Sequence, residues 1–296
     1  MIFHGWKMSN HLFYINQTDI NRLEKKDTDA AVNALESGHV LFLPNYTFSI
    51  KKEEKKLLSE SILAKNTKNI SFNYNNKKVS GMAQAQEIKT MLSNFMSNYA
   101  LYSNDLIAKL LPEYKDKLIW GRTSFRPAEI NGRVSSKRKD DARVHVDAFP
   151  SSPVNGKRIL RVFCNINPYY EARVWETGEP FPDLMQKFSY KLPKYNSIIA
   201  SLLNLVGGTK TKRSAYDHYM LKLHDTMKLD EVYQENLYKT KVQFPSNSTW
   251  VVFTDQVSHA ALSGQFLLEQ TFYLAVEDMR NPESSPLAKW ESLGVL

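Results

Sequence analysis

Two side chains in the sequence combine the residue types and the spacing of metal ligands. His145 and Asp147 stand two residues apart in the segment ARVHVDAFPSSP, residues 142–153. Residues i and i+2 of an extended strand lie on the same face, so the imidazole and the carboxylate can point toward one ion. A polar pair that satisfies itself near a strand end would have the same spacing. A metal site therefore needs a third ligand from another part of the chain.

His259 is the candidate for that third ligand. It lies in TDQVSHAALSGQ, after the apolar run TWVVF and before another β-rich run. A chain that travels around a β-barrel can return at this point beside the strand that carries His145. A lone histidine there would more often belong to the core, but a His-x-Asp pair upstream makes His259 the expected partner.

The remaining histidines show no comparable pattern. They are His4, His11, His39, His218 and His224. His218 and His224 lie six residues apart in a predicted helix, which places them on different faces. We interpret them as structural residues or as neighbours of a substrate.

Two histidines and one carboxylate are the facial triad of non-haem Fe(II) oxygenases. Three protein ligands leave three coordination positions, of which a 2-oxo acid can take two and O2 the third. Zinc hydrolases and cupin-type metal binders can use the same three residue types. The triad thus indicates a catalytic metal without fixing the reaction.

A dicarboxylate co-substrate such as 2-oxoglutarate needs a cation for its far carboxylate. Eight of the eleven arginines fall between residues 122 and 173, and guanidinium groups are suited to forked recognition of carboxylates. Arg161 stands on the polar face of the predicted strand RILRVFCNINP. Arg173 in ARVWE and Arg126 in RTSFRP are the next candidates, and Trp175 beside Arg173 is a further candidate contact.

The elements that must position these residues change in character along the chain. Residues 1–116 read as a mixed, mainly helical region, with predicted helices over 51–64 and 86–114 and a short strand in HVLFLPNYTF. Residues 117–296 contain short β-rich runs, including RVHVDAFP, TWVVFTDQ and FLLEQTFYLAV, interrupted by a helical insert around 184–234. This pattern predicts an α+β protein, with a β-barrel or jelly-roll core and helices packed outside it.

Composition narrows the class of partner. The chain has 296 residues, a net charge of +8 and a single cysteine, so it suits an anionic partner and a reducing compartment. Aromatic residues do not interleave with a basic stripe, so a nucleic-acid binder is disfavoured. The N-terminus lacks the pattern of a secretory signal. The apolar segment 197–208 is too short to span a bilayer, and we expect it to be a buried helix or strand rather than a membrane-contacting segment.

Four segments in order carry a resemblance to a known family. They are RKDDARVHVDAFPSSPVNGKRILRVFCNINP, RVWETGEPF, SAYDHYMLKLHDTMK and FPSNSTWVVFTDQVSHAALSGQFLLEQTF. Together they resemble the Kdo hydroxylases, Fe(II)/2-oxoglutarate dioxygenases that act on 3-deoxy-D-manno-oct-2-ulosonic acid (Kdo) in lipopolysaccharide. The likeness extends over residues 122–274 and is vague in the N-terminal region.

The resemblance implies a double-stranded β-helix (jelly-roll) core with His145, Asp147 and His259 as catalytic iron ligands. It also implies hydroxylation of the C3 methylene of the outer Kdo sugar of Kdo2-lipid A, with release of succinate and CO2. The enzyme would then be cytoplasmic, with a lipid A precursor as partner and a peripheral contact with the inner membrane. Many 2-oxoglutarate oxygenases have an arginine where this sequence has Glu269, so that role falls to Arg161, Arg173 or Arg126.

Two other functions fit the same residues. One is a non-haem iron oxygenase that acts on another anionic sugar or metabolite. The other is a non-catalytic, cupin-like carbohydrate binder that contains a metal.

Overall fold

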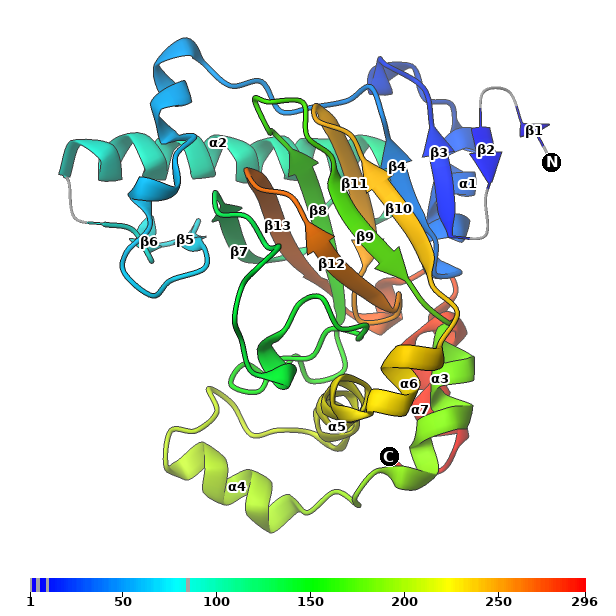
Figure 1. The fold of residues 1–296 in the computed structure, drawn as a ribbon. Helices are drawn as coiled ribbons and strands as arrows, with labels where there is room; N and C mark the ends of the chain where they lie inside the picture. The colour runs from blue at the N-terminus through cyan, green and yellow to red at the C-terminus, as the bar shows by residue number, and fades with distance from the viewer. Residues whose placement is uncertain (1, 4–5, 9–10, 84–85) are drawn as a thin grey trace.

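The computed structural model describes residues 2–3, 6–8, 11–83 and 86–296, which form two β-sheets surrounded by helices (Figure 1). The chain is thus a mixed α+β protein, as the sequence predicts. The interpretation of His4, and part of that of the N-terminal stretch, fall outside the described residues.

The larger sheet has ten strands in the order β1-β2-β3-β4-β11-β8-β13-β7-β5-β6. Their bounds are β1 Ile2–Phe3, β2 Trp6–Met8, β3 Leu12–Ile15, β4 Val40–Leu43, β5 Ile70–Asn73, β6 Lys78–Ser80, β7 Ile119–Arg126, β8 Arg158–Asn165, β11 Ser248–Phe253 and β13 Leu267–Leu274. Neighbouring strands are antiparallel except β3 and β4, which run parallel. The sheet therefore combines strands from both sides of the boundary expected at residue 116.

The smaller sheet lies in front of the centre of the larger one (Figure 1). Its strands are β9 Arg173–Thr177, β10 Thr240–Phe244 and β12 His259–Ser263, in the order β10-β9-β12. An aromatic cluster fills the space between the sheets. Phe163 and Trp250 come from the larger sheet and Trp175 and Phe244 from the smaller one. Phe244 stacks on Trp250 with ring centroids 4.0 Å apart, and such contacts fix the separation of the two layers.

Strand β8 shows how this packing orients the chemistry. Leu160 and Val162 belong to the apolar cluster on the outer side of the larger sheet, whereas Phe163 packs toward the smaller sheet. Because side chains alternate across a strand, Arg161 also faces the smaller sheet. This confirms the polar and apolar faces predicted for the strand.

Two helices cover the outer face of the larger sheet: α1 (Lys25–Glu36) and α2 (Gln86–Leu110). Figure 1 shows α2 crossing behind the sheet. Phe95 and Tyr99 of α2 are fully buried, and the Tyr99 hydroxyl donates a hydrogen bond to the carbonyl of Val162. The helix predicted over 86–114 is confirmed, with its end just before Pro112.

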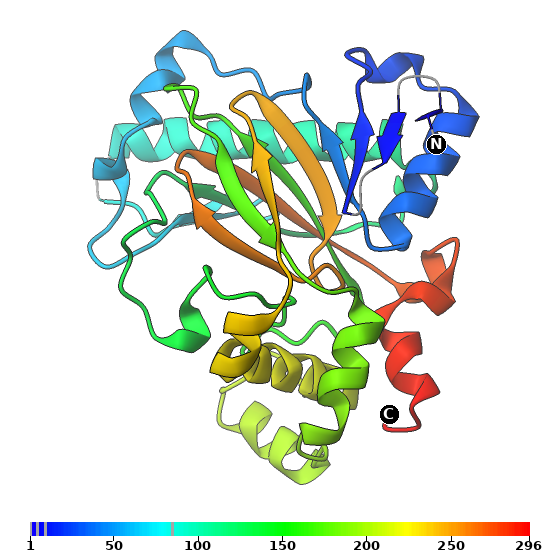
Figure 2. The same ribbon diagram turned by 45° about the vertical axis from the view of Figure 1, so that its right-hand side comes forward.

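The other helices lie at the lower end of the sheets (Figures 1 and 2). They are α3 Phe181–Phe188, α4 Ser197–Leu205, α5 Ala215–Leu229, α6 Glu231–Asn236 and α7 Pro286–Ser292. All but α4 pack around one apolar cluster that also contains Val144 and Val146. The predicted helix over 214–234 is two helices, because the side chain of Asp230 accepts a hydrogen bond from the Tyr233 amide and starts α6.

Two local predictions are wrong. Residues 51–64 form short 3-10 turns, Lys52–Leu57 and Glu60–Ile62, instead of an α-helix. The Ser59 side chain accepts a hydrogen bond from the Ser61 amide, so it caps the second turn and separates it from the first. The segment RVHVDAFP forms an isolated bridge at His145 rather than a strand.

The prediction of a buried segment over 197–208 is also wrong. It forms α4, whose apolar side chains are largely exposed. Among the described residues, no helix is both long and apolar enough to cross a membrane.

Candidate metal centre and its cavity

One cavity between the two sheets collects every residue that the sequence singled out for chemistry. Its volume is about 160 Å³, the space of about five water molecules. The predicted residues that line it are His145, Asp147, His259, Arg161, Arg173, Arg126 and Trp175. Asp141, Phe163, Ala261 and Glu269 complete the lining, and sequence reasoning did not assign these four to the site.

The two histidines meet because their backbones pair. His145 and His259 form a β-bridge with two hydrogen bonds of 3.0 and 2.8 Å. The amide of Asp147 donates to the carbonyl of Thr254, which holds the carboxylate beside them. One possible ligand atom from each of the three residues lies within 4.8 Å of the others. No other such group of three occurs among the residues that the structure describes.

Hydrogen bonds fix the tautomer of both imidazoles. Nδ1 of His145 lies 2.7 Å from the carbonyl of Arg143, and Nδ1 of His259 lies 2.8 Å from that of Val257. A carbonyl only accepts, so each Nδ1 carries the proton and each Nε2 keeps its lone pair for a metal. Trp175 stacks on the His259 ring, with centroids 4.8 Å apart.

The protonation states also suit a cation. Burial lowers the pKa of His145 to about 4 and lowers that of His259, so both rings are neutral at pH 7. Burial alone would raise the pKa of Asp147, but opposing interactions, of which that with the Arg161 guanidinium is the largest, hold the pKa well below its usual value. Two neutral nitrogens and one carboxylate are the donor set of a facial triad. These residues therefore fit Fe(II).

A chain of ion pairs orients Asp147 from the side of the larger sheet. Arg161 places Nη2 3.0 Å from Asp147 Oδ2 and donates from Nη1 to Glu269 at 2.9 Å. Glu269 also accepts two hydrogen bonds from Arg126, at 3.1 and 2.6 Å. Asp147 Oδ2 accepts no well-directed hydrogen bond from the described residues despite the short distance to Arg161. The carboxylate is thus held in place with an oxygen still available to a metal.

Arg173 differs from these paired arginines. Its Nη1 donates to the carbonyl of Gly264 at 2.7 Å, but its buried Nε has no partner and it forms no ion pair among the described residues. Burial, and then repulsion from Arg126, lowers its pKa to about 9, with Asp141 and Glu129 offsetting part of the shift. The guanidinium is still protonated at pH 7. A buried cation without a carboxylate is costly unless a ligand supplies one.

Gly264 permits this arrangement. Its φ is +110°, and a side-chain carbon there would lie only 3.0 Å from Cα of Arg173. The close approach requires glycine, because any other residue would push β9 away from the turn. Trp175, next to Arg173 on the same face of β9, also has a buried Nε1 without a hydrogen-bond partner among the described residues.

A second cavity of about 560 Å³ adjoins the first and shares Arg126, Arg161 and Glu269 with it. Its remaining lining residues are Asn73, Trp120, Gly121, Arg122, Ser124, Phe149, Pro150, Ser151, Ser152, Lys210, Thr271 and Tyr273. Aromatic rings together with cations are a suitable surface for an anionic sugar. We name this larger space, lined by these residues, the acceptor cavity.

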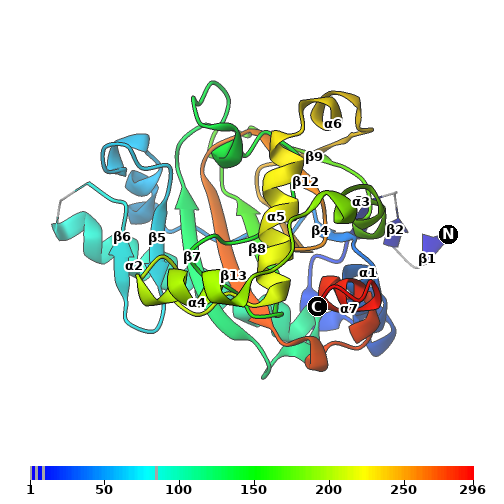
Figure 3. The same cartoon turned by 90° about the horizontal axis from the view of Figure 1, so that it is seen from below.

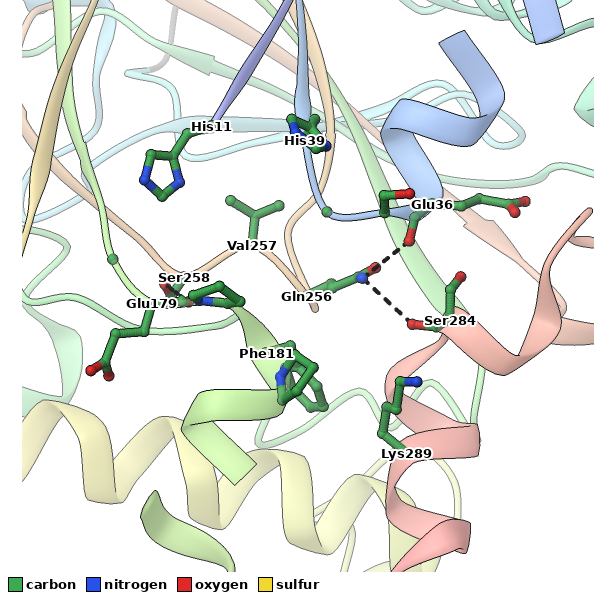
Figure 4. A pocket seen from close by; sticks show the side chains of 15 residues that line it. His11, Glu36, His39, Glu179, Phe181, Gln256, Val257, Ser258, Ser284 and Lys289 are labelled. Carbon is green, nitrogen blue, oxygen red and sulfur yellow. Dashed lines mark hydrogen bonds between the residues drawn. The ribbon is translucent and has the colours of Figure 1, made fainter. Parts of the chain in front are cut away.

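The other histidines that the structure describes, His11, His39, His218 and His224, lie outside the metal cavity. His224 packs edge-on against the ring of His145 at 5.3 Å and contacts Asp225, whereas His218 reaches the carbonyl of Pro193. His11 and His39 line a third cavity, of about 350 Å³, behind Val257. Figure 4 shows Gln256 in that cavity donating to the carbonyls of Glu36 and Ser284. The hydrogen bonds of Gln256 connect the N-terminal helix α1 to the C-terminal region of the chain. None of these side chains lines the metal cavity.

Glu269 had a signal in the sequence. It is a carboxylate inside the apolar strand FLLEQTFYLAV, and buried carboxylates are normally paired with a cation. Asp141 had no such signal, because it lies among the charged residues of KRKDDAR.

Comparisons with known proteins agree with this geometry. The sequence model described as "3-deoxy-D-manno-oct-2-ulosonic acid (Kdo) hydroxylase" matches residues 18–295, so the match includes the N-terminal region where the sequence resemblance was vague. A search of curated proteins found no match.

Crystal structures of the Kdo hydroxylase KdoO, a non-haem Fe(II) alpha-ketoglutarate-dependent dioxygenase, are similar over nearly the whole chain. The cobalt(II) complex is 44% identical with a TM-score of 0.92, covering 95% of each chain. The complex with alpha-ketoglutarate and Fe(III) is 44% identical with a TM-score of 0.92, covering 96% of each. The complex with succinate and Fe(III) has a TM-score of 0.91 at the same identity, covering 95% of each.

Proposed function

The chain belongs to the Kdo hydroxylase family of non-haem Fe(II)/2-oxoglutarate-dependent dioxygenases, and we propose that it hydroxylates C3 of the outer Kdo sugar of Kdo2-lipid A. The enzyme class and its dependence on Fe(II) and 2-oxoglutarate follow from membership in this family. The position of the hydroxyl group and the lipid-linked acceptor are the proposal. The main observation in its support is a facial triad that lines one cavity, together with a larger cavity containing cationic side chains that adjoins it at Arg126, Arg161 and Glu269.

We propose that His145, Asp147 and His259 are the iron ligands. The support is their donor set, their mutual distances and the fixed tautomers of both imidazoles. When bound, Fe(II) with 2-oxoglutarate and O2 supplies the oxidising chemistry, in which one oxygen atom enters a C–H bond of the acceptor and 2-oxoglutarate leaves as succinate and CO2.

Arg173 is the residue that we propose for the far carboxylate of 2-oxoglutarate. Arg161 had the strongest position in the sequence, but its guanidinium already pairs with Asp147 and Glu269. Arg126 pairs with Glu269 as well. Arg173 is the buried guanidinium in this cavity that lacks such a partner among the described residues. The nearby Nε1 of Trp175 is a second donor for the same carboxylate.

The residues of the chain position the reactants and exclude water. Arg161 and Glu269 hold Asp147 in one orientation, and the backbone carbonyls of Arg143 and Val257 hold the two imidazoles. Phe163 and Trp175 contribute aromatic rings to the lining of the cavity. Such fixed geometry places the acceptor C–H bond near the metal, which is the contribution a protein makes to this chemistry. No side chain is assigned as a general acid or base.

In the acceptor cavity, Arg122 and Lys210 are the cations that we propose to bind the carboxylate of Kdo. Neither forms an ion pair among the described residues, and both line the cavity with Trp120, Phe149 and Tyr273. A sugar ring can pack its apolar face on such aromatic rings while its carboxylate meets the cations.

The architecture that we propose is a double-stranded β-helix, in which the larger and smaller sheets are the two layers. Residues 117–296 would form the catalytic core, and residues 1–116 would extend the larger sheet and add α1 and α2. The proposed location is the cytoplasm with peripheral contact at the inner membrane. The single, buried thiol of Cys164 suits a reducing compartment.

The proposal is tested by incubating the protein with Fe(II), ascorbate, 2-oxoglutarate and Kdo2-lipid A that carries two deuterium atoms at C3 of the outer Kdo. The expected product has gained one oxygen atom and lost one deuterium by mass spectrometry, with one succinate formed per product. A product that keeps both deuterium atoms would place the hydroxyl group at another carbon. Succinate release only with a different anionic acceptor would replace the proposed substrate and keep the enzyme class.

A further inference from the structure

Helix α4 presents an apolar face to solvent. The exposed fractions are 78% for Ile198, 57% for Ile199, 57% for Leu202, 83% for Leu205 and 68% for Val206. On a helix these positions fall on one side, and Ala200 on the opposite side is buried against the protein. Contiguous exposed apolar surface of this kind marks an interaction site in soluble domains.

The orientation of this face is defined by the fold. Asn196 caps the helix, with its side chain accepting from the amides of Ile198 and Ile199. Gly207, at φ +75°, ends the helix by turning the chain in the left-handed region. The hydroxyl of Tyr195 donates to the carbonyl of Arg213 and closes the base of the segment. Helix α4 is therefore held as a projection with its apolar side outward.

The surroundings of the helix are basic. Residues 184–216 contain five lysines and one arginine and no aspartate or glutamate. Lys194, Lys210 and Lys212 are exposed, and their side chains form no ion pair within the described part of the chain. An apolar helix face flanked by lysines has the chemistry that binds the interface of an anionic membrane.

We propose that α4 inserts its apolar face into an anionic membrane surface and that the flanking lysines bind the lipid headgroups. Helix α4 projects at the lower edge of the molecule in Figure 1, away from the strands. Seen from below, it is drawn in front of strands β7 and β13 of the larger sheet (Figure 3). Its apolar side chains are therefore free to enter a surface without moving the sheets.

The segment that follows α4 connects this surface to the acceptor cavity. The amide of Lys210 donates to the carbonyl of Ser151 at 3.0 Å, and Arg213 donates to the carbonyl of Pro150 at 2.7 Å. Ser151, Pro150 and Lys210 all line the acceptor cavity. A protein seated on α4 therefore places the mouth of this cavity next to the headgroup layer. This consequence rests on the proposed function, whereas membrane binding itself does not.

Charge favours a membrane over a second copy of the chain. A two-fold symmetric contact brings the same surface of both copies together, and here it would place the lysines that flank one α4 against those of the other. Phospholipid headgroups supply the opposite charge instead. The short helix, with a few bulky apolar side chains, also matches the shallow depth to which an interfacial helix inserts.

The experiment is vesicle flotation of the full chain without iron or Kdo, so it is independent of hydroxylation. Vesicles of phosphatidylcholine mixed with phosphatidylglycerol should carry the protein upward at low salt, and pure phosphatidylcholine should carry much less. The double variant Leu202→Asn, Leu205→Asn should lower partitioning by roughly tenfold or more, since two apolar side chains lose their burial. Lys194→Gln with Lys212→Gln should lower binding to the anionic vesicles by roughly fivefold per lysine.

The matched control is Val232→Asn with Tyr238→Asn, two apolar side chains that are 70% and 80% exposed away from α4. Flotation of this control should equal that of the unchanged protein, and circular dichroism should show both double variants folded. Equal flotation of the α4 variant and the unchanged protein, or no flotation of either, would overturn the inference. So would a dimer by light scattering that the α4 variant converts to a monomer. A protein that floats but does not hydroxylate Kdo2-lipid A would remove the proposed acceptor and keep the membrane surface.

Discussion

The metal cavity has one wall from the larger sheet and one from the smaller sheet, and the two walls differ in how their buried arginines are paired. On the wall of the larger sheet, Arg126 and Arg161 both pair with Glu269, and Arg161 also pairs with Asp147. On the wall of the smaller sheet, Arg173 forms no ion pair among the described residues, and Trp175 has a buried Nε1 without a partner there. Arg161 also has a buried Nε without a partner, so the contrast between the two arginines is the presence or absence of a carboxylate. Both walls are drawn from neighbouring β-strands and both contain arginine, so residue type alone does not separate them.

The difference separates positioning from binding. A buried ion pair that is already complete has little left to offer a ligand, but it holds its members in one geometry. An unpaired buried donor lowers the stability of the empty protein and is satisfied when a ligand arrives. The larger sheet therefore sets the orientation of Asp147, and the smaller sheet carries the donors that we propose to bind the co-substrate.

The largest expected effect is removal of the ligand carried by the smaller sheet. His259→Ala should abolish iron binding and turnover, because two ligands leave too many open positions for a stable site. Bound metal is measured with Co(II) by its visible absorption, and turnover is measured by succinate release. His218→Ala is the matched control and should keep both properties. Normal Co(II) binding by His259→Ala would assign the third ligand elsewhere.

The next largest effect is expected on the wall of the larger sheet, where the arginines form ion pairs. Arg161→Met should lower the free energy of unfolding by about 3–5 kcal/mol, because it leaves Asp147 and Glu269 as buried charges with less compensation. Iron affinity should also fall by roughly tenfold to a hundredfold as Asp147 loses its orientation. Chemical denaturation and Co(II) titration measure the two quantities.

Arg158 provides the comparison for that variant, since it forms a buried ion pair with Asp255 outside the cavity lining. Arg158→Met should be destabilised similarly while its folded form binds Co(II) normally. If both variants change Co(II) affinity equally, Arg161 has no specific role in orienting Asp147.

The sequence predicted the inward side of β8, and with it the presence of Arg161 in the site, because alternation along a strand is a local property. It also predicted that His145, Asp147 and His259 lie together, because the i, i+2 spacing and the β-rich runs around His259 can be recognised in the sequence. The partners of Arg161 were not readable. They depend on the register that places Glu269 opposite Phe163 across β8 and β13, and register is decided by tertiary packing. The preference for Arg161 over Arg173 at the co-substrate came from position along the strand alone, and the pairing of Arg161 with Asp147 and Glu269 is the reason why we propose Arg173 instead.

The apolar segment 197–208 shows a second limit. Its composition is that of a core helix, and nothing in its own residues states which side will face the protein. The side-chain cap at Asn196 and the hydrogen bond from the Tyr195 hydroxyl to the carbonyl of Arg213 hold the helix so that it projects from the protein. The absence of acidic residues around it was a usable signal, because core helices of soluble domains normally have acidic as well as basic neighbours.

A smaller effect is expected from the unpaired arginine. Arg173→Met should raise the 2-oxoglutarate concentration for half-maximal succinate release by roughly tenfold to a hundredfold, the loss of one charge-assisted contact. The rate at saturating 2-oxoglutarate should change less. The empty variant should be at least as stable as the unchanged protein, because a buried charge without a carboxylate partner has been removed.

Arg126→Met tests the other wall by the same measurements. Its loss should destabilise the protein, because Glu269 loses a partner, and it should change the 2-oxoglutarate requirement less than Arg173→Met does. The reverse order, with Arg126→Met giving the larger requirement and Arg173→Met the larger loss of stability, would exchange the roles of the two walls.

The smallest expected effect concerns Nε1 of Trp175, the second donor on the wall of the smaller sheet. Trp175→Phe keeps an aromatic ring against His259 but removes the indole N–H, which should raise the half-saturating 2-oxoglutarate concentration by roughly fivefold, the value of one neutral hydrogen bond. Trp250 is a matched control because its buried Nε1 also has no partner among the described residues but does not line the cavity. Trp250→Phe should lower the free energy of unfolding and leave the 2-oxoglutarate requirement unchanged. Equal requirements in the two variants would mean that the donor of Trp175 does not meet the co-substrate, and Arg173 would then bind the carboxylate alone.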